Sequence, residues 1–419
     1  MVAFLQPSCN RAANNGEKRH GMAVASNAET GPRGRLRLRG EAASMKFGLF
    51  TEADTPRGYS VARRYKEVIC EAQFAEDMGF DVWGCSEQHF TGPVATTSAP
   101  EVIYGAVAQA TSKIKLRTMS SVMLKFNHPL RVAERLATID VISEGRLEIG
   151  TVRGNNPHVV QAFEVDATKS MEEWEESLRV VAKAMTQPMI EHDSPRYKIH
   201  PVRLWPRLYQ PQFPSTYVSS TGLATHQQAG SLGLGVMSFT VYGWDHVEES
   251  LRAYRKASEA STPIPGIPVN RSIARLFLGG QCAATKKDAL EKVRPSCLGF
   301  MKFLVAFFGS TSEKSPDYAY LNDWKKLIAG HEDDLEWMND NLPQVLNGTP
   351  DHVIEQVKRV QAMGFDEVIF RIDGNGHRQI MESLEYFGKY VIPEFRNPDD
   401  VVQQSTYEDL GVFPPPFML

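Results

Sequence analysis

Short apolar segments alternate with longer amphipathic segments along most of the 419-residue chain. Four times, an amphipathic segment runs through a glycine into an apolar stretch: clearly at residues 76–83 and 361–370, more loosely at 143–149 and 230–237. Glycine just past a helix adopts a left-handed conformation without a Cβ clash, so each copy predicts a helix end followed by a strand. Strands that alternate with helices are typical of a parallel sheet.

The same pattern predicts eight strands across the body of the chain. They are Lys46–Phe50, Asp81–Gly84, Lys115–Met119, Leu147–Gly150, Thr216–Ser219, Gly235–Ser238, Ile273–Gly279 and Glu367–Arg371. A doubly wound dinucleotide-binding sheet would place Gly-x-Gly-x-x-Gly after its first strand, where this chain has Thr-Glu-Ala-Asp-Thr-Pro at residues 51–56. Eight such units instead favour an α/β fold of the (β/α)8 TIM barrel type, with insertions.

We predict three regions: a leader (1–44), a barrel domain (45–396) and a C-terminal tail (397–419). The leader is rich in Gly, Ala, Asn and Arg without hydrophobic periodicity, which is typical of disorder. An organelle address is one interpretation of its arginines, but a simple tail, or a true start at Met45, is favoured over it. Within the barrel, residues 187–214 are predicted to be an insertion.

Composition and charge restrict the classes of protein. The chain is 42% hydrophobic and 23% charged, which is ordinary for a globular protein, and it contains no apolar run long enough for a transmembrane helix. The net charge is −4; the leader carries +4, so the body carries −8, which argues against nucleic acid as the main partner. The five cysteines are scattered without a Cys-x-x-Cys pair, which predicts a reduced, cytoplasmic protein.

Two strand ends carry residues suited to an anion. Arg153 follows the fourth predicted strand, beside Gly154, and an arginine fork next to an open backbone suits a phosphate. The fifth strand leads through Thr221, Gly222 and Thr225 into a helix whose first N–H groups and hydroxyls could hold an anion. A solvated arginine and ordinary N-capping explain either feature alone. Because the two strands are predicted neighbours, we favour a phosphate site.

The second and third strand ends carry other candidates for chemistry. The second runs into Cys-Ser-Glu-Gln-His-Phe at residues 85–90, and the third leads to Ser120, Ser121 and His128. His89 and His128 could form a metal-binding pair, but no His-x-His or His-Glu-x-x-His occurs, so we predict no metal site. The absence of a Gly-x-Ser-x-Gly elbow also argues against a nucleophilic serine.

In this order and spacing, the motifs resemble those of the bacterial luciferase-like flavin monooxygenase family over nearly the whole body. Met-Lys-Phe-Gly-Leu-Phe at 45–50 looks like the family's start, Glu-Gln-His-Phe at 87–90 resembles its Glu-His-His-Phe, and Asn-His-Pro-Leu-Arg at 127–131 is similar to its His-Pro-hydrophobic-Arg turn. Residues 144–154 look like its Gly-Arg strand with the phosphate arginine, and residues 370–395 resemble its final strand and helix.

The resemblance implies a (β/α)8 barrel, usually a homodimer, that binds FMN at the carboxyl ends of its strands. Arg153 would hold the FMN phosphate, helped by Thr221 and Thr225. Ser120 and Ser121 match a pair of small residues under the isoalloxazine ring that is often joined by a cis peptide bond.

The resemblance also implies which side chains would line the substrate cavity. Glu87 and His128 match cavity residues, and Phe308–Lys325 matches a lid after the seventh strand. Luciferase has a histidine where this chain has Gln88, which forms hydrogen bonds but is not an acid or base near neutral pH. This departure puts light emission and an aldehyde substrate in doubt, and leaves His89 and His128 as candidates for proton handling.

We therefore expect a two-component flavin-dependent monooxygenase. Reduced FMN would come from a separate flavin reductase, because no second nucleotide motif is visible, and O2 would oxygenate a small or medium organic substrate. Aromatic candidates for the substrate pocket are Phe126, Tyr242, Trp244 and Phe308. Two alternatives stay open: an F420-dependent oxidoreductase that transfers hydride, and a non-catalytic flavin-binding protein of the same fold.

Overall fold

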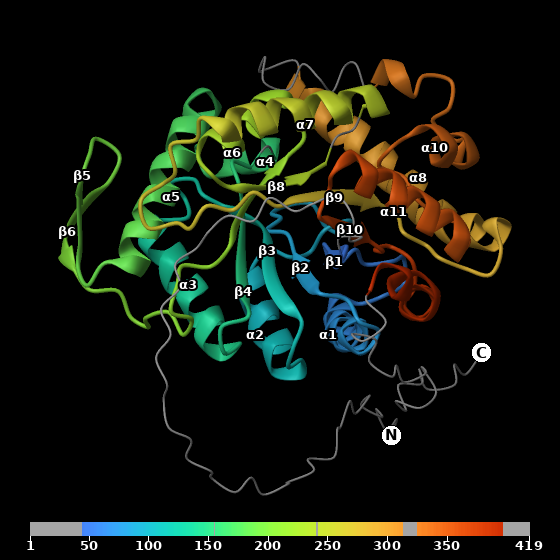
Figure 1. Ribbon diagram of the computed structural model, residues 1–419, viewed down its shortest axis with the longest axis horizontal. Coiled ribbons are helices and arrows are strands. Elements are labelled where there is room, and N and C mark those ends of the chain that lie inside the picture. Colours follow the sequence, from blue (N-terminus) through green and yellow to red (C-terminus); the bar gives the residue numbers. More distant parts are fainter. Residues whose placement is uncertain (1–43, 155, 240–241, 313–324, 397–419) are drawn as a thin grey trace, which may run out of the picture.

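Eight parallel strands close into a barrel whose outside is covered by helices (Figure 1). The computed structural model describes residues 44–154, 156–239, 242–312 and 325–396, without the side chains of residues 157 and 307–312. Around the barrel the strand order is β1-β10-β9-β8-β7-β4-β3-β2. The barrel strands are β1 (Lys46–Thr51), β2 (Val82–Cys85), β3 (Lys115–Val122), β4 (Leu147–Val152), β7 (Thr216–Ser220), β8 (Gly235–Ser238), β9 (Ile273–Leu278) and β10 (Glu367–Arg371).

The predicted (β/α)8 barrel is therefore confirmed, and all eight predicted strands are present. The largest difference in length is in β3, which continues to Val122 through an irregular step between Thr118 and Ser121. The four glycines that the repeated pattern places between helix and strand all have positive φ angles, as a helix-ending glycine requires. They are Gly79, Gly145, Gly233 and Gly364.

The helices pack their apolar faces on the barrel wall. In α1, for example, Val68, Ala72 and Ala75 are fully buried, at the spacing of one helix face. The helices are α1 (Val61–Asp77), α2 (Pro100–Ala110), α3 (Pro129–Ile142), α4 (Pro157–Ala162), α5 (Ser170–Thr186), α6 (Leu223–Ser231), α7 (Trp244–Glu259), α8 (Lys286–Ser312), α10 (Leu335–Asn341), α11 (Pro350–Met363) and α12 (His377–Tyr386). Shorter turns are η1 (Ala167–Lys169), η3 (Phe387–Val391) and η4 (Ile392–Phe395).

The barrel interior contains charge as well as apolar side chains. Arg117 on β3 is completely buried, and its guanidinium donates to Glu148 on β4 and, at 2.8 and 2.9 Å, to Glu367 on β10. It also stacks on the ring of Tyr217, 3.8 Å away. Since each charge has partners, this network ties three strands together across the barrel. It sits near the strand starts and leaves the carboxyl ends to the candidate site.

The predicted insertion at 187–214 is a distinct feature of the fold. It contains an antiparallel hairpin, β5 (Ile190–Asp193) and β6 (Lys198–Val202), which projects from the barrel beside α5 (Figure 1). The expectation that the lid begins at Phe308 is corrected, because α8 continues as a helix to Ser312. The rest of the predicted lid up to residue 324, the leader except Ser44, and the tail lie outside the described residues, so the predicted domain boundaries stay predictions.

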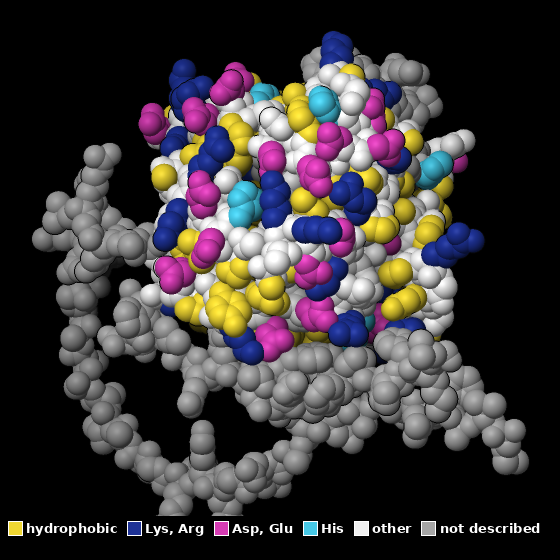
Figure 2. Space-filling model, turned by 90° about the vertical axis from the view of Figure 1, so that its right-hand side faces the viewer, with side chains coloured by type: hydrophobic (Ala, Val, Ile, Leu, Met, Phe, Trp, Pro, Cys, Tyr) yellow, Lys and Arg dark blue, Asp and Glu magenta, His cyan; other side chains and the backbone are white. Residues whose placement is uncertain are grey.

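The surface view in Figure 2 shows a face on which basic and acidic side chains are interspersed, with small apolar groups between them. On this face neither sign of charge forms a continuous patch. Within the described ranges, no helix is long and apolar enough to cross a membrane.

Candidate functional site

The predicted phosphate residues come together at the ends of β4 and β7. These strands pair, with Thr151 opposite Val218, so Arg153 just past β4 lies beside the turn that leads from β7 into α6. Gly222 is the N-cap of α6, and no side chain of the described residues caps this helix. The ordinary N-capping explanation for the two threonines therefore does not hold. Within the described part of the chain, the first N–H groups of α6 are therefore open to an anion.

A buried histidine that the sequence did not single out holds this turn in place. His226 on α6 lies 2.8 Å from the hydroxyl of Ser220 and 2.9 Å from that of Ser238, so it joins the ends of β7 and β8. Its Nδ1 also contacts the carbonyl oxygen of Gly222 at 2.9 Å. Burial lowers the pKa of His226 to about 4, so its ring is neutral under ordinary conditions. A neutral ring adds no positive charge at this turn, so the part of His226 is to hold the ends of β7 and β8 together.

Glu87 is the centre of a second set of contacts, at the ends of β2 and β3. Its carboxylate accepts hydrogen bonds from the backbone N–H of Val122 at 2.9 Å and from the amide of Asn127 at 2.6 Å. The Nε2 atom of His89 lies 3.0 Å from the same carboxylate. Glu87 thus fixes the β3 end and holds His89, as a carboxylate does for a histidine that moves protons.

His89 lies in an aromatic environment at the barrel mouth. The rings of Phe126 and Phe163 meet its ring edge to face, with centroids 5.8 and 5.5 Å away, and they stack on each other at 4.4 Å. Its backbone carbonyl accepts a 2.6 Å hydrogen bond from Asn156, which caps α4. The histidine is therefore fixed by Glu87 on one side and by aromatic rings on the others, and its side chain is 17% exposed.

Ser120 and Ser121 lie on the irregular part of β3, close to Glu87. The hydroxyl of Ser120 accepts a 3.0 Å hydrogen bond from the backbone N–H of Glu87, and the carbonyl of Ser121 accepts from Thr151 at 3.2 Å. Among the described residues, cis peptide bonds occur at Gly92–Pro93 and Trp205–Pro206. The Ser120–Ser121 bond is trans, so the expected cis peptide is not found.

The structure separates His128 from the Glu87–His89 pair. His128 is exposed, caps α3 by accepting a 3.3 Å hydrogen bond from the N–H of Leu130, and packs edge to face against Tyr197 of the hairpin region. Its neighbour Asn127 is the residue that reaches Glu87. The catalytic role predicted for His128 stays untested, but its contacts here are those of a helix cap.

Gln88 connects the second strand end to the first. Its amide donates a 3.1 Å hydrogen bond to Glu52, which follows β1 and also accepts from the hydroxyl of Ser86 at 3.2 Å. Burial raises the pKa of Glu52, an effect that the guanidinium of Arg371 opposes. The sequence pattern did not identify Glu52, because a single carboxylate after a strand is ordinary.

The aromatic residues predicted to line the pocket have different surroundings. Phe126 lies beside His89, as expected of a mouth residue. Trp244 begins α7 and stacks under the guanidinium of Arg359 from α11 at 3.7 Å, so it serves helix packing. The ring of Tyr242 packs on His246, with centroids 4.4 Å apart, and the side chain of Phe308 lies outside the described part.

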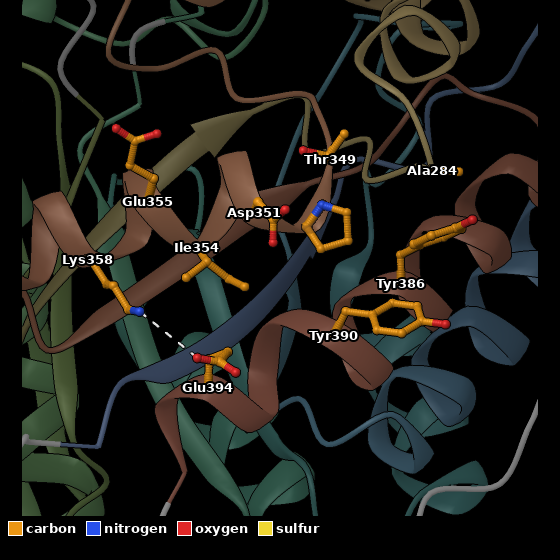
Figure 3. Close-up of a pocket in the computed structure, with 10 residues that line it drawn as sticks. Ala284, Thr349, Asp351, Ile354, Glu355, Lys358, Tyr386, Tyr390 and Glu394 are labelled. Carbon is orange, nitrogen blue, oxygen red and sulfur yellow. Dashed lines mark ion pairs between the residues drawn. The ribbon is translucent and has the colours of Figure 1, made fainter.

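A separate groove lies on the outside of the barrel, between α11 and the C-terminal helices (Figure 3). Tyr386 and Tyr390 line one side of it, and an ion pair between Lys358 and Glu394, 4.0 Å apart, closes its lower end. The groove is on the wall and not at the strand ends, so it is not the candidate site. Within the described residues, no group of three or more His, Cys, Asp or Glu side chains is placed to hold a metal ion.

Comparison with known proteins identifies the family. The sequence profile described as luciferase-like monooxygenase matches residues 45–367, more than half of the chain. The chain belongs to the luciferase-like monooxygenase family. Among curated relatives, limonene 1,2-monooxygenase of Rhodococcus erythropolis is 27% identical over 360 residues, which is 84% of this chain and 87% of the relative.

Solved structures of luciferase-like proteins share the fold at lower identity. The oxygenating constituent of 3,6-diketocamphane monooxygenase from Pseudomonas putida, in complex with FMN, has a TM-score of 0.67 and 21% identity, covering 85% of this chain and 100% of that one. An F420-dependent secondary alcohol dehydrogenase has a TM-score of 0.64 and 15% identity, covering 84% and 100%. This fold therefore occurs both in a protein that binds FMN and in a protein that depends on F420.

Proposed function

We propose that this protein is a two-component flavin-dependent monooxygenase that uses reduced FMN and O2 to oxygenate a small or medium organic substrate. The observation that carries the proposal is that the barrel mouth holds two sites, two strands apart. Arg153 and the uncapped start of α6 suit a phosphate, while two strands away Glu87 holds His89 among aromatic rings. A flavin mononucleotide has a phosphate at one end and its reactive ring at the other, and so would span both sites.

The residues present fit such a cofactor. A Cβ atom added at Gly222 would meet no atom of the described residues within 4 Å, so they leave open space in front of the α6 N-terminus. Between the two sites, Ser120 and Ser121 present only small side chains at the irregular step of β3, over which a flat ring could lie. When bound, reduced FMN would supply the two electrons that place one atom of O2 in the substrate and the other in water.

The side chains of this chain would then have separate tasks. Arg153, Thr221, Thr225 and the N–H groups after Gly222 would bind the phosphate. His89, held by Glu87 at 3.0 Å, would hold or release a proton at its ring nitrogen near the reactive end of the flavin. The aromatic residues around His89 would exclude water from this region.

A variant of Arg153 tests whether this arginine binds the phosphate. Arg153→Ala should weaken binding of reduced FMN by about 1.5–3 kcal/mol, or roughly 10- to 150-fold in Kd, the range for a hydrogen bond to a charged group. It should affect riboflavin, which lacks the phosphate, far less. Anaerobic fluorescence titration of both flavins measures the difference. Arg252→Ala is the matched control, because this arginine is 71% exposed on α7.

Equal weakening of FMN and riboflavin by Arg153→Ala would show that this arginine does not bind the phosphate. Tight binding of F420 with no response to reduced FMN would instead favour the alternative, a hydride-transferring oxidoreductase. The separate flavin reductase, the homodimer and the cytoplasmic location belong to the same proposal. They follow from the family resemblance and the composition.

A further inference from the structure

The ends of β1 and β10 carry a buried charged cluster that the proposed function does not use. We call it the β1–β10 cluster: Glu52, Asp54, Arg371 and Asp373. In the closed strand order, β1 lies four strands from β7, and β10 lies four strands from β4. The cluster is therefore across the mouth from the proposed phosphate side. A substrate that lay in the mouth on the side away from the flavin phosphate would contact the β1–β10 cluster.

Arg371 is the cation of this cluster and has an unused donor. Its Nε donates to Glu52 at 2.9 Å, and its guanidinium lies over the ring of Phe300 at 3.7 Å. The side chain is only 3% exposed, yet its Nη2 atom has no hydrogen-bond partner among the described residues. Nη2 faces the carboxyl of Asp54, which is 3.6 Å away and beyond hydrogen-bond distance. A buried donor without a hydrogen bond is costly and rare. Because Asp54 is already at ion-pair distance, a small movement of its carboxyl, such as contact with a ligand could cause, would supply the missing acceptor.

Asp54 is the member of the cluster that faces outward. Its side chain is 14% exposed, against 1% for Asp373, and its carboxyl forms no hydrogen bond within the described residues. The preceding residue, Ala53, has a φ of 53°, an uncommon conformation for alanine. Hydrogen bonds to the side chains of Thr51, Thr55 and Thr96 hold Ala53 in that conformation. Such strain persists where the surroundings impose it, often at ligand sites.

The charges around Asp54 set its protonation. Burial raises the pKa of Asp54 to about 7, Arg371 and Arg64 oppose the rise, and Asp373 and Glu52 add to it. These four groups, from the ends of β1 and β10 and from α1, have the largest effects on Asp54. Near neutral pH, Asp54 is therefore protonated in a substantial part of the molecules, and in that form it can donate a hydrogen bond.

Building on the proposed function, we propose that Asp54 is the substrate-contacting residue of a polar subsite that binds an uncharged oxygen, carbonyl or hydroxyl, with Arg371 as its positioning residue. A protonated Asp54 donates to such an oxygen, and Arg371 orients the Asp54 carboxyl from behind. An anionic substrate is disfavoured, because Glu52 and Asp373 are close to the same point.

Gln88 links this subsite to the Glu87–His89 pair. Its amide donates to Glu52 at 3.1 Å, while its chain neighbours on either side are Glu87 and His89. The polar end of a substrate held at Asp54 would thus be one strand away from the side chains that we assign to proton handling. Gln88 has no proton to exchange, so its task would be to hold Glu52 in place.

Two probes of equal carbon number test the subsite: octan-2-one, which is neutral, and octanoate, which is anionic. Isothermal titration of the protein, with and without bound FMN, should show tighter binding of octan-2-one than of octanoate at pH 6. Between pH 6 and pH 8 the Kd for octan-2-one should rise about tenfold, as Asp54 with a pKa near 7 loses its proton. Asp54→Asn, whose amide keeps a donor, should remove this pH dependence and leave FMN affinity unchanged.

Two further variants complete the test. Glu52→Gln removes one of the charges that raise the pKa of Asp54, so the pH midpoint of octan-2-one binding should move downward. If Glu52 were only structural, its replacement would not shift this midpoint. Asp340→Asn, at an aspartate that is 50% exposed, should behave as wild type. The same pH dependence in wild type and Asp54→Asn would overturn the proposal, as would failure of octan-2-one to bind at pH 6. If the wild type did not bind FMN at all, the proposed function would be refuted. The probe titrations without flavin would still show whether Asp54 binds the neutral oxygen.

Discussion

Replacing Glu87 with glutamine tests the corner between β2 and β3, because the carboxylate there accepts from three donors. One oxygen accepts from the backbone N–H of Val122 at 2.9 Å. The other accepts from Asn127 at 2.6 Å and lies 3.0 Å from the ring of His89. A glutamine side chain has one acceptor oxygen, and its other end is a donor.

Either orientation of the new amide leaves a buried donor without an acceptor. If the amide oxygen faces Asn127 and His89, the NH2 group meets the N–H of Val122. If it faces Val122, the NH2 group meets the amide of Asn127. Glu87→Gln should therefore lower the free energy of unfolding by about 1–3 kcal/mol, the cost of one unsatisfied buried donor. Glu291→Gln, at a 62% exposed glutamate on α8, should change it by less than about 0.5 kcal/mol.

Urea unfolding of the flavin-free protein, followed by far-UV circular dichroism, measures both variants. The comparison is valid if the denaturant slope is the same in all three proteins, because a changed slope signals a different unfolded or native state. A Glu87→Gln variant with the wild-type midpoint would refute the reasoning, since it would mean that the carboxylate does not hold this corner.

Three other predictions concern single side chains. His89→Ala should leave FMN affinity nearly intact but divert reduced flavin to hydrogen peroxide, measured as product formed per flavin oxidised; normal coupling would make this histidine structural. Gly150→Ala should lower the free energy of unfolding by about 1–3 kcal/mol or more, because its Cβ would lie 2.1 Å from the carbonyl oxygen of Thr118. Gly105→Ala is the control in the same urea unfolding experiment: its Cβ would meet no described atom within 4 Å, so it should be neutral or stabilising. The pKa of His226 is about 4 in the folded protein and 6.5 in an unfolded chain. As the pH falls, the unfolded chain therefore binds this proton first. The free energy of unfolding of the wild type should therefore fall by roughly 3 kcal/mol between pH 6.5 and pH 4. His226→Gln should remove this contribution, and urea unfolding at a series of pH values measures it.

The barrel was predictable because its signals are local. The alternation of apolar and amphipathic segments and the glycine that follows four of the helices depend on backbone geometry that each segment carries with it. Positions such as Gly79 and Gly364 show this directly, since both have the positive φ that the pattern requires. The order of strands then places Arg153 beside the β7–α6 turn without further information.

The side-chain network of the site was less predictable, because it depends on contacts between distant segments. His128 and His89 look equivalent in the sequence, but one caps a helix and the other is held by a carboxylate. The roles of Glu52 and Asp54 arise from Arg371, more than 300 residues away, and from burial, which composition does not reveal. The end of α8 was missed because small polar residues favour a loop only weakly.

Anaerobic titration of the wild-type protein with reduced FMN and with reduced F420, followed by admission of air, tests the central claim most directly. The account predicts saturable binding of reduced FMN, much weaker binding of F420, and oxidation of the bound flavin that begins only when O2 is admitted. Tight binding of F420, or no detectable binding of reduced FMN by a folded protein, would contradict it.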